Sequence, residues 1–155
     1  METFMVAATV ASAAMSYQAA QDQADTTEAT GRYNTRLAEN EAVRTRNKGV
    51  EEENKHREKV RLLHSKQRAQ LGASSLDMTS GSPLDLQAET LVKGEADALR
   101  IRSNFGDEAN ALDNKGKITT FESNAKAGGI RSNANASLLS SSAKVGSQWY
   151  DYTIN

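Results

Sequence analysis

The position of a single proline constrains the fold of this chain more than any other feature. Pro83 is the one proline among 155 residues, and it closes a cluster, 71–83, that also holds two glycines, four serines and a threonine. Such a density of glycine, serine and proline is typical of a turn. The residues that dominate the flanking sequence, such as alanine, glutamate, arginine and leucine, favour helix. The sequence therefore predicts an all-α fold, an elongated antiparallel helical hairpin with alanine- and serine-rich terminal segments.

Five segments follow from this interpretation. They are an N-terminal helix of small, largely uncharged residues (1–27), a charged helix (28–71), a turn (72–82), a second helix (83–127) and a polar C-terminal tail with an aromatic end (128–155). Glycine disfavours helix, so the sequence leaves open whether the second helix continues past Gly116.

The predicted turn contains residues suited to ending one helix and starting the next. Gly72 is placed to end the first helix in the left-handed conformation. Ser82 is the expected N-cap of the second helix, with Pro83 and Asp85 in its first turn. The predicted turn residues are Gly72, Asp77, Ser80, Gly81, Ser82, Pro83 and Asp85.

The charges are balanced overall but divided along the chain. The net charge is −1, which argues against a general nucleic-acid binder. Residues 28–70 carry a net charge of +4 and residues 71–115 a net charge of −4. We therefore expect the two arms to pair, with ion pairs that set register more than stability.

On the second helix, nine positions between 84 and 112 follow alternating spacings of four and three, and all of them except Glu95 and Arg102 are apolar. This spacing predicts a coiled-coil-like packing seam. Its apolar members are Leu84, Ala88, Leu91, Ala98, Phe105, Ala109 and Leu112. The seam could serve the hairpin itself, a neighbouring subunit, or both.

Both ends of the chain are candidates for membrane contact. The stretch 3–21 has no charged residue and is about as long as a membrane-spanning helix. Tryptophan and tyrosine at the other end suit a membrane interface, but also a protein interface. The candidate membrane contacts are Phe4, Met5, Val6, Val10, Met15, Trp149 and Tyr150. An alanine-rich helix packed against protein and a docked tail are the alternatives.

The sequence lacks the patterns of known catalytic and metal sites. Cysteine is absent, which excludes a disulfide framework and a thiol nucleophile. His56 and His64 lie in a charged helix without an HExxH motif, and no GxSxG or nucleotide-binding loop occurs. We expect no enzyme, no cofactor and no metal, and a function in assembly or interaction.

The hairpin region resembles a known family. The sequence RAQLGASSLDMTSGSPLDL from Arg68, followed by EADALRIRSN from Glu95, is similar to the small internal virion protein of short-tailed bacteriophages. That family has a comparable SGSPLD turn followed by an EADAL-type helix. The match is strongest over 67–104.

The resemblance implies a structural virion protein that is packaged in the capsid core near the portal and ejected with the genome. It would then help to form a DNA-translocation channel in the host outer membrane. The implied partners are further copies of the chain, in a ring, the portal and other internal virion proteins. DNA would pass without sequence-specific binding. The alternative is a helical adaptor bound to the portal or core that never enters a membrane.

Overall fold

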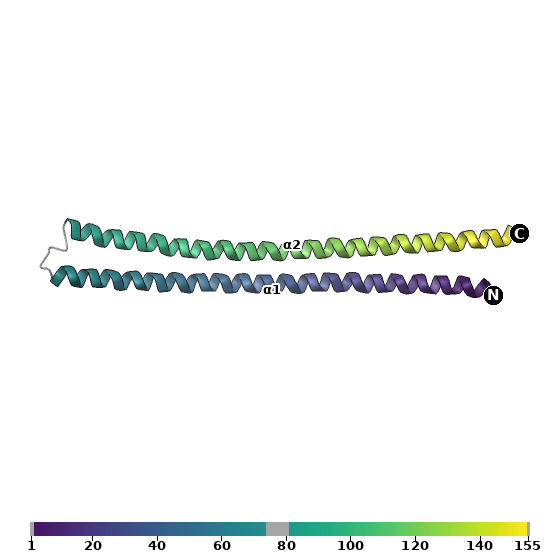
Figure 1. Ribbon diagram of the computed structural model, residues 1–155, viewed down its shortest axis with the longest axis horizontal. Helices are drawn as coiled ribbons and strands as arrows, with labels where there is room; N and C mark the ends of the chain where they lie inside the picture. The colour runs from purple at the N-terminus through teal and green to yellow at the C-terminus, as the bar shows by residue number, and fades with distance from the viewer. Residues whose placement is uncertain (1, 74–80, 155) are drawn as a thin grey trace. The chain divides into compact units, whose positions relative to one another are not determined.

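The protein is an all-α helical hairpin, as its sequence predicts. The computed structural model describes the backbone of residues 2–73 and 81–154, and the side chains of 11–73, 81–144 and 146. Helix α1 (Glu2–Ala73) and helix α2 (Ser82–Ile154) pack against each other and contain every described residue except Gly81 (Figure 1). The described ranges contain no strand.

Both helices are longer than the predicted segments. Helix α1 passes through the expected boundary at 27–28 without a break. Helix α2 continues through Gly116 and through Gly128–Gly129, so the segment predicted as a tail is helical up to Ile154. The side chains of Ala127 and Ala134 are buried, while Gly128 and Gly129 lie on an open face. Packing on the buried side thus offsets the cost of each exposed glycine, which is about 1 kcal/mol.

Helix α2 begins one residue earlier than expected. The Gly81 carbonyl accepts hydrogen bonds from the amides of Leu84 (3.1 Å) and Asp85 (3.2 Å), which makes Gly81 the N-cap rather than Ser82. Gly81 has a φ of 66°, a conformation that glycine adopts at little cost. Pro83 then occupies the second helical position, where its missing amide donor is still not needed.

The expected left-handed cap at Gly72 is not observed. Gly72 lies within α1, which ends at Ala73. The left-handed conformation occurs instead at Gly81, at the entry to the next helix. Asp77 and Ser80, which were also predicted as turn residues, lie outside the described residues.

The chain divides into two units, each of which pairs a segment of α1 with a segment of α2. In its described part, unit 1 comprises residues 2–37 and 115–154. Unit 2 comprises residues 38–73 and 81–114.

Small residues make up the buried core of both units. Every buried apolar side chain among the described residues is an alanine, and the largest fully buried side chain belongs to Glu53. Four glycines, Gly31, Gly49, Gly94 and Gly116, are buried as well. Small residues allow two helix backbones to approach closely. The buried alanines are Ala24, Ala42, Ala98, Ala109, Ala127 and Ala134.

The side of α2 that faces α1 follows an 11-residue repeat, with spacings of three, four and four. Eleven residues in three turns correspond to about 3.67 residues per turn, close to the period of a straight α-helix. The buried and half-buried residues of this repeat are Gln87, Thr90, Gly94, Ala98, Ile101, Phe105, Ala109, Leu112, Gly116, Thr120, Ser123, Ala127, Arg131, Ala134 and Leu138. We call this set the α2 seam.

Candidate functional site

Three glycines mark the closest contacts between the helices. A Cβ atom placed on Gly49 would lie 2.6 Å from Cβ of Phe105, and one on Gly94 would lie 2.5 Å from Cγ1 of Val60. A Cβ on Gly31 would collide with the side chain of Ser123. Each glycine therefore leaves room for a side chain of the opposite helix.

These contacts define a single register. In each of the three pairs, 31 with 123, 49 with 105 and 60 with 94, the residue numbers add to 154. The pairs within unit 1 and unit 2 thus follow the same alignment of α1 with α2. The sequence hint for Gly94 is its place in the 11-residue repeat of α2, because Gly94, Phe105, Gly116 and Ala127 are each 11 residues apart. A prediction based on the spacing of apolar residues does not detect these glycine positions, because glycine has no apolar side chain.

Two threonines link the helices of unit 1 by hydroxyl contacts. The Thr35 Oγ1 atom lies 2.6 Å from Thr120 Oγ1 and 2.9 Å from the carbonyl oxygens of Gly31 and Gly116. One hydroxyl has a single proton, so Thr35 donates to one acceptor at a time. The close approach at Gly116 brings the backbone of α2 within reach of a side chain on α1.

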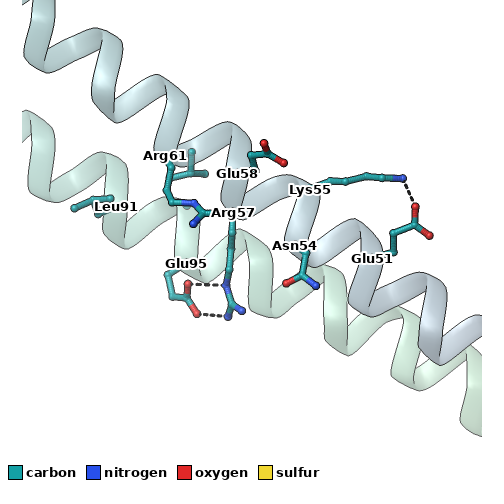
Figure 2. A pocket seen from close by; sticks show the side chains of 10 residues that line it. Glu51, Asn54, Lys55, Arg57, Glu58, Arg61, Leu91 and Glu95 are labelled. Atoms are coloured by element: carbon teal, nitrogen blue, oxygen red, sulfur yellow. Dashed lines mark hydrogen bonds and ion pairs between the residues drawn. The ribbon is translucent and has the colours of Figure 1, made fainter.

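A bidentate ion pair spans the helices of unit 2 beside a groove. Arg57 donates to Glu95 from Nε (3.1 Å to Oε2) and Nη2 (2.6 Å to Oε1), as Figure 2 shows. These hydrogen bonds lower the pKa of Glu95 and raise that of Arg57. The groove lies where Gly94 has no side chain, and Leu91 also lines it. A second cross-helix pair joins Arg46 to Asp113 at 2.6 Å.

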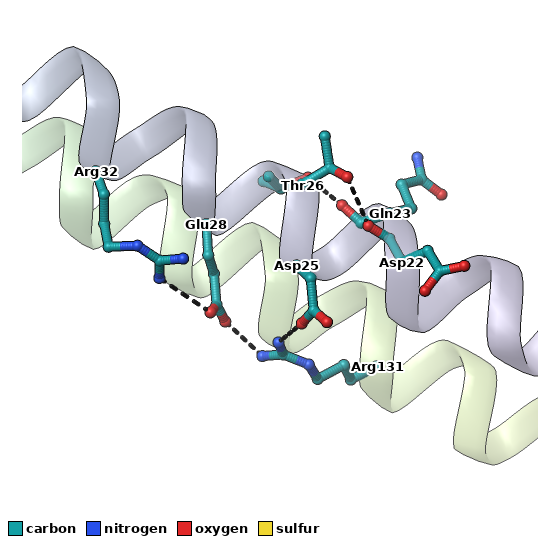
Figure 3. A network of polar contacts seen from close by, with 8 residues as sticks. Asp22, Gln23, Asp25, Thr26, Glu28, Arg32 and Arg131 are labelled. Carbon is teal, nitrogen blue, oxygen red and sulfur yellow. Dashed lines mark hydrogen bonds and ion pairs between the residues drawn. The ribbon is translucent and has the colours of Figure 1, made fainter.

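Arg131 forms the corresponding network in unit 1. Its guanidinium donates to Asp25 Oδ1 (2.7 Å) and to Glu28 Oε1 (2.5 Å) across the two helices (Figure 3). Arg32 lies 3.6 Å from the other oxygen of Glu28. The hydrogen bond from Arg131 lowers the pKa of Glu28 below its usual value of 4.5. Here the cation lies on α2 and the carboxylates on α1, whereas the pairing expected from the charge pattern, with cations on the first arm and carboxylates on the second, occurs in Arg57–Glu95 and Arg46–Asp113.

Polar groups occupy part of the interface in unit 2. Glu53 is 2% exposed, with carboxylate oxygens 3.0 Å from Arg57 Nη1 and 3.8 Å from Arg102 Nη1. Two buried atoms, His56 Nε2 and Gln67 Oε1, have no hydrogen-bond partner within the described part of the chain, whereas Glu53 Oε1 keeps its ion pair with Arg57. A buried polar atom without a partner costs about 1–3 kcal/mol. The unpartnered atoms of His56 and Gln67 therefore weaken this stretch of the interface.

The predicted seam and the α2 seam coincide over only part of their length. Ala98 and Ala109 are buried and Phe105 and Leu112 half-buried, so these four face α1. Leu84, Ala88 and Leu91 are exposed, and Gln87, Thr90 and Gly94 take their places. A seven-residue repeat drifts by about 20° per heptad on a straight helix, so positions four heptads apart no longer share a face.

The candidate membrane residues lie mostly beyond the described side chains. Met15 is 73% exposed. The side chains of Phe4, Met5, Val6, Val10, Trp149 and Tyr150 lie outside the described residues. Over the described ranges, neither helix contains a stretch that is both long enough and apolar enough to cross a membrane.

The described residues also contain no group of three or more histidine, aspartate or glutamate side chains that could hold a metal ion. What they do provide is an interface of close contacts, hydroxyl bridges and ion pairs between α1 and α2. In comparisons with known proteins, no family model, no curated protein and no solved structure matches this chain.

Proposed function

We propose that this chain is an internal virion protein of a short-tailed bacteriophage, packaged near the portal and ejected with the genome to help form a channel in the host outer membrane. The observation that carries the proposal is the sequence of the hairpin region, 67–104, which resembles that family. In the structure this region contains the end of α1 and the start of α2.

The packing of the helices supports a protein that must pass a narrow tail. The buried apolar side chains are alanines, and no disulfide can form because cysteine is absent. Separating such helices exposes little apolar surface, so they can come apart and reassemble at modest cost. A second candidate is a purely structural adaptor on the portal or core. It is favoured by large apolar side chains that are exposed in the described residues, such as Val92 and Phe121, because such side chains suit contacts with other virion proteins.

Mass spectrometry of purified virions, before and after genome release, tests the proposal. We expect the chain in full particles and its loss from emptied ones. Absence from full particles would exclude both candidates, while retention in emptied particles would favour the adaptor.

Deletion of residues 1–24 separates the two candidates. A channel subunit whose N-terminal segment contacts membrane gives normal particles that fail to deliver DNA. An adaptor held by this segment gives particles that lack the protein.

A further inference from the structure

The part of α1 nearest the hairpin loop combines exposed leucines with unpaired cations. Residues 59–70 contain four lysines and arginines and no carboxylate. All four side chains are exposed, and none of them forms an ion pair within the described part of the chain. They are Lys59, Arg61, Lys66 and Arg68.

Six other cations of unit 2 are paired with carboxylates, whereas Arg44 and Lys48 form no ion pair within the described residues. Ion pairs involve Arg46, Lys55, Arg57, Lys93, Arg100 and Arg102. On α2, Glu89 is paired with Lys93 at 2.5 Å, and Glu95 with Arg57 at 2.6 Å. These carboxylates are already engaged, so the four cations of 59–70 keep a positive charge available for another partner.

Two of these cations share a helix face with two leucines. Lys59, Leu62, Leu63 and Lys66 follow the spacing i, i+3, i+4, i+7, which places them on one side of α1. We call these four residues the Lys–Leu face. Leu62 is 57% exposed and Leu63 is 50% exposed.

The Lys–Leu face points away from α2. In this part of α1 other residues face α2. Val60 lies against Gly94, and Gln67 donates a hydrogen bond to Thr90 Oγ1 at 3.1 Å. This arrangement is the reverse of ordinary helix packing, because the polar side chain of Gln67 lies between the helices while Leu62 and Leu63 are exposed to water. Exposed leucine beside lysine is typical of a helix that lies on a membrane surface.

We propose that the Lys–Leu face binds the surface of an anionic lipid bilayer. Leu62 and Leu63 enter the boundary between headgroups and acyl chains, while Lys59 and Lys66 contact phosphate groups. The leucines distinguish this partner from DNA, whose phosphates would attract the lysines but offer no apolar medium. The binding lies on the bilayer rather than across it and does not depend on the proposed virion function.

Flotation of the full-length protein with vesicles tests the proposal. We expect flotation with phosphatidylcholine vesicles that contain phosphatidylglycerol, weakening as salt is added, and none with phosphatidylcholine alone. The double variant Lys59→Gln/Lys66→Gln should bind about 25-fold more weakly, from roughly fivefold per lysine. The double variant Leu62→Ser/Leu63→Ser should lose about tenfold or more.

Matched variants outside the face provide the controls. Arg36→Gln/Arg44→Gln removes two exposed cations that form no ion pair with any described residue. Val43→Ser/Val50→Ser removes two apolar side chains that are 53% and 45% exposed. Both should float like the unmodified protein. Glu58→Gln removes the carboxylate one turn before Leu62 and should strengthen binding.

Three outcomes would overturn the proposal. The first is equal flotation of the Lys–Leu variants and the controls. The second is binding to duplex DNA that the lysine variant loses and the leucine variant keeps, without flotation. The third is self-association that the leucine variant abolishes, again without flotation, which would assign the face to a second copy. Circular dichroism confirms that each variant remains helical.

Discussion

Single glycines have opposite effects in this chain, depending on the face that they occupy. Gly49 faces Phe105 at a distance that leaves no room for a Cβ atom, whereas a Cβ on Gly106, in the same unit, would meet nothing within 4 Å. Lys48 adds a cation–π contact 5.7 Å from the centroid of the Phe105 ring. Glycine at 49 is thus required by packing, and glycine at 106 only weakens the helix.

This contrast predicts opposite effects for the same substitution. Gly49→Ala should destabilise the protein by about 1–3 kcal/mol, because it overpacks the interface. Gly106→Ala should stabilise it by about 1 kcal/mol, because alanine has the higher helix propensity. Urea unfolding followed by circular dichroism measures both. Equal changes in the two variants would contradict the close contact at Gly49.

The carboxylates beside Arg57 and Arg131 predict sensitivity to acid. The pKa of Glu95 and that of Glu28 are lowered, chiefly by hydrogen bonds from these arginines. A carboxyl group whose pKa is lower in the folded state stabilises the fold at pH values above its usual pKa of 4.5. That stability is lost as the pH falls through the lowered pKa.

Thermal unfolding between about pH 7 and pH 3 measures this loss. Arg57→Gln/Arg131→Gln should lower the midpoint at neutral pH and reduce its decrease on acidification. Arg44→Gln is the control, because Arg44 has no ion pair in the part of the chain that the structure describes. An unchanged pH profile in the double variant would show that the cross-helix pairs do not contribute.

At the scale of the helices, the sequence predicts existence and order better than it predicts the contact face. Pro83 and the surrounding glycines and serines located the break, and α2 begins within one residue of the expected position. The face from Ala98 to Leu112 was also predictable. The face nearer the loop was not, because Gln87, Thr90 and Gly94 carry no apolar signal while Leu84 and Leu91 do. The C-terminal part of α2 was not predicted either, because Gly128–Gly129 disfavours helix and the residues that pack there are alanines such as Ala127 and Ala134.

Cysteine pairs can distinguish the two seams, because the natural chain has no cysteine. In Val60→Cys/Gly94→Cys, the new Cβ at 94 starts 3.1 Å from Cβ of residue 60, close enough for a disulfide after a small adjustment. Val60→Cys/Leu91→Cys tests the seven-residue seam instead. We expect efficient oxidation of the first pair, read as a mobility shift on non-reducing gels. Preferential oxidation of the second pair would favour the seven-residue seam.

At the scale of the whole molecule, the distribution of large apolar residues predicts self-association. Fifteen large apolar side chains among the described residues are 44–74% exposed. Burial of such side chains between copies would add stability that rises with concentration. Sedimentation should show species larger than the monomer, and the midpoint of thermal unfolding should rise with protein concentration. A monomer with a constant midpoint would contradict this prediction.

The small residues between the helices also affect how stability changes with temperature. The heat capacity of unfolding grows with the apolar surface that becomes exposed, and alanine and glycine expose little. We therefore expect a heat-capacity change below the usual value of about 12–15 cal/mol/K per residue. The stability curve of a single chain would then be shallow, so warming and cooling would alter the balance between paired and separated helices less than in a protein with a leucine-rich core.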